Sequence, residues 1–370
     1  MKNANSHDGR KDRLPVWALV VIDILATCLA LGIFMLFHLI IPRIQQQKAA
    51  EQSEAIHTTS VLATPVPEPE RKTKSEKGTE TESVTESEST EPLDDWKFAS
   101  LTTDEVVITD TSYSSHDIHI DIFSFEEGEG VIKSPYTVAD IYVRDVRCLQ
   151  SYFAGGKYIP TGHGEPMLDL MDKSGAIVAS NGDYYSMQLG SGVLRNGILY
   201  RYPVADFDVF VLYDDGSVKI YRRKTIRTKA GWEEAFDHAW QAWSFGPSLL
   251  DENGVQYPNL RENLFGFIVN RNPRTGIGYF EPGHYCLVVI DGRSDEASGA
   301  TIEELAAVFE DLGCSQAYNL DGGGSSVMAF NGEIVTNQST ERKLPDIILV
   351  AEYEESPAMQ EDEKEAEGQP

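Results

Sequence analysis

The sequence predicts an α+β domain with a mixed, hairpin-rich β-sheet core and a few packed helices, preceded by one transmembrane helix. Two observations support this fold class. Asn-Gly pairs, which readily adopt the positive φ values of tight turns, recur between short apolar runs. Helical patterns are few, and one apolar run near the N-terminus is long enough to cross a bilayer.

The predicted transmembrane helix covers residues 17–41, an apolar run that only Asp23 and His38 interrupt. Such a run can span roughly 30 Å of hydrocarbon. Basic residues in segment 1–16 favour a cytoplasmic N-terminus, although Arg43 and Lys48 follow the helix. A cleaved signal peptide is the rival interpretation, but its apolar region is usually shorter. We therefore expect a single-pass protein of the cell membrane with an extracellular globular domain.

Two further segments lack the apolar residues that a core requires. Residues 42–100 are rich in Ser, Thr, Glu and Pro, which predicts a disordered linker, and residues 354–370 form an acidic disordered tail. Residues 101–353 carry most of the aromatic side chains and are long enough for one globular domain. The net charge of −28 argues against nucleic-acid binding, which requires a basic surface. No pattern predicts an oligomeric state.

Short apolar runs between turn signals place the expected strands and helices. Hairpins are expected at 192–200 and 326–335, each around an Asn-Gly pair. Further strands are expected at 106–108, 118–125, 137–143, 207–213, 218–221, 266–269, 285–290 and 346–353. The best helix candidate is 301–312, where Thr301 and Glu304 form a capping box and Gly313 ends the helix. Other helices are expected at 146–153, 165–172 and 232–243.

The strongest candidate for a functional site is the segment 317–328, in which a short apolar strand leads Asn319 and Asp321 into a triple-glycine loop. Glycine lets the backbone approach a ligand closely, and successive backbone amides can form an anion-binding nest. A tight turn that joins two strands would produce the same pattern. The segment therefore indicates an anion site or a plain turn.

Two other strand ends carry similar side chains. The run 176–179 leads to Asn181 and Asp183 and then to two tyrosines, a mixture typical of carbohydrate sites, although Asp183 could also serve only as a turn residue. The strand 285–290 leads to Asp291 and Arg293, which could equally form a surface ion pair. Arg274 lies in a glycine-containing loop and could bind phosphate through two hydrogen bonds.

Taken in this order, five segments resemble the phosphodiester glycosidase family. They are 181–185, 245–250, 273–278, 291–293 together with 299–305, and 319–326, and the resemblance extends over roughly 141–350. The chain looks most like bacterial, membrane-anchored members of the exopolysaccharide-biosynthesis type. The segment after Arg342 departs from the family's closing pattern, so Arg342 is not counted among the predicted site residues.

The resemblance implies an extracytoplasmic hydrolase that cleaves sugar 1-phosphodiesters in envelope or exopolysaccharide glycans. Such chemistry calls for carboxylates near the glycosidic bond, and the expected ones are Asp291, Asp321 and Asp183. The expected substrate-binding residues are Asn181, Tyr184, Tyr185, Arg274, Arg293, Asn319, Gly322, Gly323, Gly324 and Ser325.

Cofactors and rival functions stay open at this point. No cofactor is expected to be required, but the Asp and Asn oxygens at the glycine loop could ligate calcium or magnesium. No His and Cys pattern supports zinc. One alternative is a noncatalytic module that binds envelope glycan and assists polysaccharide assembly. Another is a metal-dependent phosphodiesterase that cleaves the P–O bond.

Overall fold

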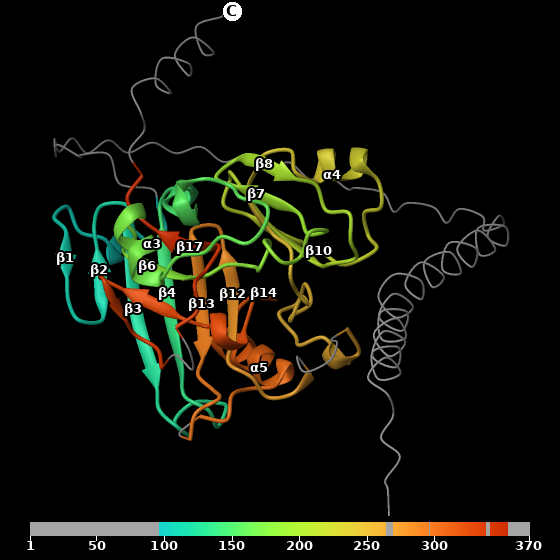
Figure 1. Cartoon of the computed structure of the whole chain (residues 1–370). Helices are drawn as coiled ribbons and strands as arrows, with labels where there is room; N and C mark the ends of the chain where they lie inside the picture. Colours follow the sequence, from blue (N-terminus) through green and yellow to red (C-terminus); the bar gives the residue numbers. More distant parts are fainter. Residues whose placement is uncertain (1–95, 264–268, 296, 338–340, 354–370) are drawn as a thin grey trace, which may run out of the picture. The chain divides into compact units, whose positions relative to one another are not determined.

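The computed structural model describes residues 96–263, 269–295, 297–337 and 341–353 (Figure 1). The predicted transmembrane helix at 17–41, the segment 1–16, the linker up to residue 95 and the tail 354–370 lie outside the described residues. Within the described residues, no helix is both long and apolar enough to cross a membrane.

The described strands form three sheets, and every strand pair in them is antiparallel. The largest sheet contains, in spatial order, β1 (Val107–Ile108), β2 (Ser112–Ser114), β3 (Ile118–Phe125), β4 (Tyr136–Val143), β13 (His284–Ile290), β12 (Arg274–Glu281) and β14 (Gln316–Asn319). The second contains β10 (Val218–Tyr221), β9 (Val209–Tyr213), β11 (Ala239–Trp243), β7 (Val193–Arg195) and β8 (Ile198–Arg201). The third contains β16 (Glu333–Ile334), β15 (Met328–Phe330), β6 (Val178–Asn181), β17 (Asp346–Val350) and β5 (Leu149–Phe153).

Helices in the described part are few and short. The α-helices are α3 (Met167–Ser174), α4 (Lys229–Ala235) and α5 (Ile302–Leu312). The 3₁₀ turns are η2 (Ala99–Leu101), η3 (Val146–Cys148), η4 (Ala154–Gly156), η5 (Leu260–Asn263) and η7 (Gly323–Ser325). This sheet-rich arrangement with a few packed helices confirms the predicted α+β class.

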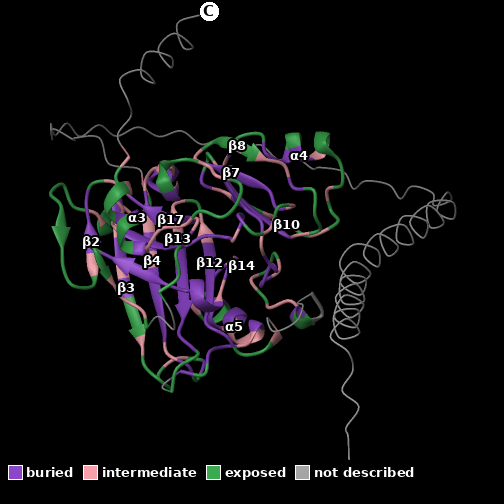
Figure 2. Ribbon diagram, in the orientation of Figure 1, coloured by how far each residue is buried: buried purple, intermediate pink, exposed green. Residues whose placement is uncertain are grey.

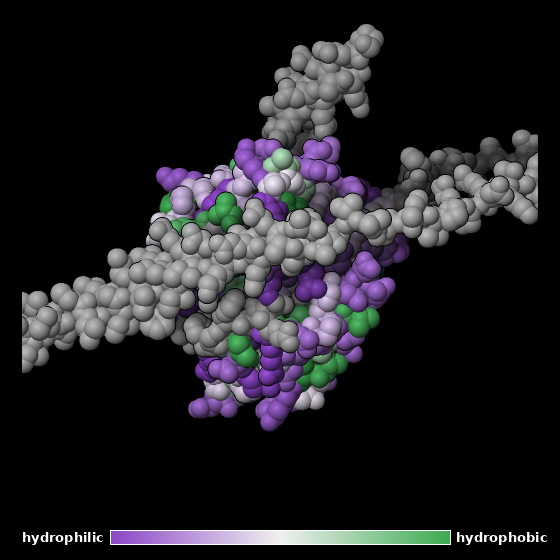
Figure 3. Space-filling model, turned by 90° about the vertical axis from the view of Figure 1, so that its right-hand side faces the viewer, coloured by the Kyte–Doolittle hydropathy of each residue, from purple (hydrophilic) through white to green (hydrophobic). Residues whose placement is uncertain are grey.

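Both faces of β13, at the centre of the largest sheet, are buried, which explains why this strand is a continuous apolar run (Figure 2). Successive side chains of a strand point to opposite faces. In β13, Leu287 and Val289 belong to a core shared with the two smaller sheets, whereas Val288 and Ile290 pack in the core that contains α5. The face of the molecule shown in Figure 3 is mostly hydrophilic, with small separate hydrophobic areas.

Helix α5 forms where the sequence predicts it because its ends are fixed by local hydrogen bonds. The Thr301 hydroxyl accepts the Glu304 amide at 3.2 Å, and the Glu304 carboxylate accepts the Thr301 amide at 2.8 Å. Gly313 ends the helix at a φ of 82°, a left-handed conformation that favours glycine. The predicted hairpins at 192–200 and 326–335 are also confirmed, as β7–β8 and β15–β16.

Two predicted helices are wrong. In 146–153 only η3 is helical, and the rest is β5, in which Leu149, Ser151 and Phe153 are buried on alternate positions. In 232–243 the helix ends at Ala235, and the remainder pairs as β11 with its neighbours. A short apolar run fits both the helical period and the strand period, so its secondary structure is decided by pairing with strands that are distant in the sequence. The predicted strand at 266–269 falls outside the described residues except for Val269.

Candidate functional site

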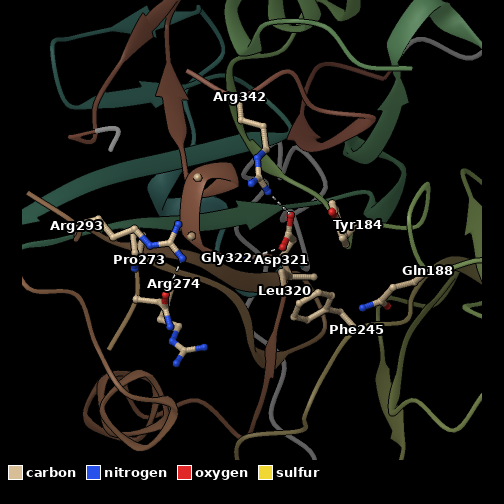
Figure 4. A pocket seen from close by; sticks show the side chains of 13 residues that line it. Tyr184, Gln188, Phe245, Pro273, Arg274, Arg293, Leu320, Asp321, Gly322 and Arg342 are labelled. Atoms are coloured by element: carbon tan, nitrogen blue, oxygen red, sulfur yellow. Dashed lines mark hydrogen bonds and ion pairs between the residues drawn. The ribbon is translucent and has the colours of Figure 1, made fainter. Parts of the chain in front are cut away.

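A pocket of about 270 Å³ opens where strand ends of the large and third sheets meet (Figure 4). The glycine loop after β14, the loop after β6 and the segments next to the ends of β11, β12 and β13 all contribute to its wall. Its lining residues are Tyr184, Gln188, Phe245, Asn272, Pro273, Arg274, Arg293, Leu320, Asp321, Gly322, Gly323, Gly324 and Arg342.

The glycine loop forms one side of the pocket, and two of its glycines are sterically required. A Cβ on Gly322 would lie 2.8 Å from the Pro273 carbonyl oxygen. Gly323 has a φ of +65°, and a Cβ there would lie 3.0 Å from the Arg293 guanidinium. The loop therefore packs directly against Pro273 and Arg293, and the Gly323 amide donates to the Pro273 carbonyl at 2.9 Å.

Asp321 is the one carboxylate among the described residues that line the pocket. The Gly322 amide donates to its Oδ1 at 2.9 Å, and Arg342 Nη1 lies 4.0 Å from its Oδ2. Burial raises the pKa of Asp321 to about 6, while the Ser325 hydroxyl, Arg342 and the Gly322 amide act in the opposite direction. An acid with a pKa near 6 can gain or lose a proton close to neutral pH.

Two arginines provide positive charge beside Asp321. Arg342 donates to the Ser325 hydroxyl at 3.0 Å, and its side chain is 45% exposed, so much of the guanidinium faces solvent. Arg293 donates to the Asn272 side-chain oxygen at 2.7 Å and has a φ of 61°, which is uncommon for a residue with a side chain. Figure 4 shows the two guanidinium groups directed toward the centre of the pocket from different sides.

An aromatic and amide wall lies on the side of the pocket away from Arg293 (Figure 4). It consists of Tyr184, Phe245 and Gln188. Tyr184 is held at a φ of 66°, and such backbone strain clusters at ligand sites. Gln188 Oε1 is buried and has no hydrogen-bond partner among the described residues. This wall offers ring faces together with an unused acceptor.

Several predicted binding residues support the pocket from behind rather than line it. Asn181 is buried, donates to the Asp321 carbonyl at 2.8 Å and accepts the Thr275 hydroxyl at 2.8 Å. Asn319 donates to the Gly246 carbonyl at 2.7 Å, and Ser325 holds Arg342. Tyr185 is almost fully buried.

Two predicted catalytic carboxylates also lie outside the pocket lining. Asp291 accepts two hydrogen bonds of 3.1 Å from Asn337, one from the backbone amide and one from the side chain. Asp183 is completely buried and binds Arg195 at 2.8 Å. Neither carboxylate is among the residues that line the pocket with Asp321.

Arg274 lines the pocket, but its guanidinium is turned to the backbone. It donates to the Ala300 carbonyl at 3.0 Å and to the Asn270 carbonyl at 2.9 Å, and Figure 4 shows it directed away from Asp321. Burial lowers the pKa of Arg274 to about 10. The arginine thus ties the loop before β12 to the start of α5.

Arg342 and Gln188 line the pocket although the sequence did not predict them as site residues. Arg342 precedes a segment that departs from the family pattern, and Gln188 has no neighbouring motif. Phe245 and Pro273 fall within segments that carry the family resemblance, which was a usable signal. Among the described residues, no group of three or more His, Cys, Asp or Glu side chains is placed to hold a metal ion.

The pocket thus combines one carboxylate, two cationic groups and an aromatic wall, an arrangement that can bind an anionic group next to a ring face. Residues 174–351 match the model of the family described as phosphodiester glycosidase. This part of the chain is therefore similar to the phosphodiester glycosidases.

Two known proteins show the same relationship at a distance. The uncharacterized prophage-derived protein YomE of Bacillus subtilis is 27% identical over 207 residues, which cover 52% of this chain and 31% of the relative, so the match spans about a third of that protein. The catalytic domain of zebrafish N-acetylglucosamine-1-phosphodiester alpha-N-acetylglucosaminidase, auto-inhibited by its pro-peptide, is 20% identical. That match has a TM-score of 0.53 and covers 67% of this chain and 88% of the zebrafish domain, so the two share a fold.

Proposed function

We propose that this protein hydrolyses sugar 1-phosphodiesters, with Asp321 as the reacting carboxylate. The observation that carries the proposal is the position of Asp321, which lies between the cationic groups and the aromatic wall of one pocket. The match of residues 174–351 to the phosphodiester glycosidases supports the same reaction class.

The two sides of the pocket fit the two parts of such a substrate. Arg293 and Arg342 can bind the phosphate oxygens, and the Gly324 amide can add a neutral donor. The Gly322 and Gly323 amides donate to Asp321 Oδ1 and to the Pro273 carbonyl, each at 2.9 Å, and so hold the loop in place. Tyr184 and Phe245 offer ring faces to the sugar. Asp321 would then lie near the bond that joins them.

The proposed step breaks the bond between the anomeric carbon and the phosphate oxygen, which leaves with the electron pair. A water oxygen forms the new bond to the anomeric carbon, and Asp321 takes the proton of that water. Phosphate is a good leaving group, so it needs little acid assistance, and the arginines stabilise its charge. A single carboxylate in the pocket is sufficient for this step, although many glycosidases use two.

We also propose that the substrate is an envelope or exopolysaccharide glycan and that the domain acts outside the cytoplasm. The apolar run at 17–41 and the charge pattern of its flanks support a single membrane anchor. The linker before residue 96 would let the domain reach substrates at some distance from the bilayer.

The test is incubation of the full chain with a panel of sugar 1-phosphodiesters in ¹⁸O-labelled water. We expect free reducing sugar that carries the label, together with unlabelled phosphomonoester. Label on the phosphate would mean P–O cleavage and overturn the proposed bond. Binding without release of sugar would favour the glycan-binding alternative. Activity that survives dialysis against a strong chelator would show that no metal is required.

A further inference from the structure

A strongly basic segment stands out in this acidic protein. Residues 222–229, between β10 and α4, contain five Lys or Arg side chains and no acidic residue, whereas the whole chain has a net charge of −28. Arg222, Lys224, Arg227 and Lys229 are exposed. Within the described part of the chain, two of the five form ion pairs: Lys224 lies 3.9 Å from Asp206 and Lys229 lies 2.7 Å from Glu233. The segment therefore keeps an excess of positive charge.

Three apolar side chains protrude from two neighbouring loops. Val204 is 82% exposed, Met187 is 62% exposed and Leu189 is 59% exposed. The Val204 and Ala205 amides both donate to the Gly190 carbonyl, at 2.9 and 3.0 Å, so the two loops lie side by side. Exposed apolar side chains that cluster in this way mark an interaction surface.

The basic segment and the apolar loops belong to one surface. The Arg223 amide donates to Asp208 Oδ1 at 2.7 Å, and Lys224 contacts Asp206 in the loop that begins at Val204. Figure 3 faces the side of the molecule that carries β8, β10 and α4, and it shows small hydrophobic areas among hydrophilic ones. We name the residues Met187, Leu189, Val204, Lys224 and Arg227 the basic-apolar face.

Arg201 holds the loop that carries Met187 and Leu189, and the bonds to Gly190 hold the loop at Val204 against it. Arg201 donates to the carbonyls of Tyr185, Gln188 and Ser191 at 2.9, 3.0 and 2.7 Å. The protruding side chains are therefore presented on a fixed backbone and need little ordering when they meet a partner.

We propose that the basic-apolar face docks on an anionic lipid surface. Anionic headgroups attract Lys and Arg side chains, and protruding apolar side chains enter the boundary between headgroups and acyl chains. A polyanionic glycan would use the charges alone and would leave Val204, Met187 and Leu189 exposed to water. The docking contact is separate from the predicted helix at 17–41 and does not depend on the proposed reaction.

Docking would also bring the pocket close to the membrane surface. Gln188 lines the pocket and stands between Met187 and Leu189 in the same loop. A bilayer that contacts those two side chains therefore lies next to the pocket wall formed by Gln188 and Tyr184. The domain would meet phosphodiesters that are held at the membrane surface.

The experiment uses the full chain with Cys28→Ser and a single environment-sensitive dye on Val204→Cys, because Cys148, Cys286 and Cys314 are buried. A second preparation carries the dye on Val255→Cys, a position that is 50% exposed outside this face. Both are mixed with vesicles of phosphatidylcholine alone and with vesicles of equal parts phosphatidylcholine and phosphatidylglycerol. We expect a blue shift only for position 204, only with phosphatidylglycerol, and reversal by salt.

The charge requirement is tested with matched double variants. Lys224→Glu with Arg227→Glu should lower the ratio of docked to undocked protein at least about thirty-fold, whereas Lys97→Glu with Lys133→Glu changes the net charge equally and should keep the shift. The proposal is overturned by an absent shift at position 204, by an equal shift at position 255, or by a shift that survives in the first variant. A blue shift with soluble polyphosphate and no lipid would also overturn it and indicate a polyanion site.

Discussion

Asp321 with Arg342 and Asp183 with Arg195 are the same pair of residue types in two environments. In the pocket, Arg342 is 45% exposed and lies 4.0 Å from Asp321. In the interior, Arg195 is 1% exposed and binds Asp183 at 2.8 Å and Asp346 at 3.0 Å. Asp321 and Arg342 therefore keep donors and acceptors that a ligand can use. The donors and acceptors of Asp183 and Arg195 are nearly all engaged in hydrogen bonds within the protein.

This difference between the two pairs indicates that Asp183 has a structural role. Asp183 accepts hydrogen bonds from Arg195, from the Ser244 amide at 2.8 Å and from the Tyr185 amide at 3.2 Å. Ser244 and Tyr185 are the chain neighbours of Phe245 and Tyr184, which form the aromatic wall. The buried cluster therefore supports the aromatic wall, and the proposed reaction is assigned to Asp321 and Arg342 in the pocket.

The largest effect is expected from Arg195→Met, which leaves two buried carboxylates without their shared cation. Breaking a buried ion pair from one side costs about 3–5 kcal/mol of stability. The measurement is the free energy of unfolding in urea. Arg342→Met is the matched control, because its half-exposed side chain should contribute less than about 1 kcal/mol. Equal losses in both variants would contradict the comparison.

A loss of turnover with little loss of stability is expected from Asp321→Asn. The amide cannot take a proton from water, and general-base catalysis contributes up to about 10³–10⁴-fold in rate. Asp291→Asn is the control, because Asp291 lies outside the pocket lining, and its rate should change less than tenfold. Steady-state kinetics on an active phosphodiester would measure both. A larger loss for Asp291→Asn would move the reacting group to that residue.

Local signals predicted some of these features well. The capping box of Thr301 and Glu304 and the Asn-Gly hairpins depend on residues close in sequence, so α5 and two hairpins were placed correctly. β5 and β11 were read as helix because their alternate burial comes from pairing with β17, β7 and β9. A short stretch of the sequence does not include the partner strands, so it cannot predict this pairing.

The same limit applies to the site. The triple glycine and Asp321 form a local motif, so the sequence indicated that side of the pocket. The contact from Asn181 to the Asp321 carbonyl joins residues 140 positions apart, and the burial of Asp183 depends on Arg195 and Asp346. Whether an Asp becomes a reactant or a structural anion is decided by those distant partners.

The pH dependence follows from the pKa of Asp321. In the proposed mechanism Asp321 acts as a carboxylate, so kcat/KM should rise about tenfold per pH unit below its pKa of about 6 and level off above it. Arg342 lowers this pKa, so Arg342→Gln should shift the profile to higher pH. A profile that falls through pH 6 would assign Asp321 the role of an acid.

The stability should depend on pH with a definite sign. The pKa of an unfolded Asp is about 3.9, so between pH 4 and 6 the folded state holds more protons at Asp321 than the unfolded state. The contribution of Asp321 to stability is therefore complete below about pH 4 and falls as the pH rises, by up to roughly 3 kcal/mol. Asp321→Asn should remove this decline in unfolding experiments. A decline of equal size in the variant would assign it to another group.

The smallest effect is expected in the buried cluster, from Asp346→Asn. Burial raises the pKa of Asp346 to about 7, and its Oδ1 has no partner among the described residues, so an uncharged side chain is already tolerated there. Both oxygens of Asp183 accept N–H groups, so an amide at that position must turn an NH₂ toward a donor. We expect Asp346→Asn to change the unfolding free energy by less than about 1 kcal/mol and Asp183→Asn to cost at least about 2 kcal/mol more. Equal changes in unfolding free energy for the two variants would mean that Asp183 and Asp346 share the negative charge beside Arg195 evenly. Asp183 would then contribute no more than Asp346 to the support of the aromatic wall.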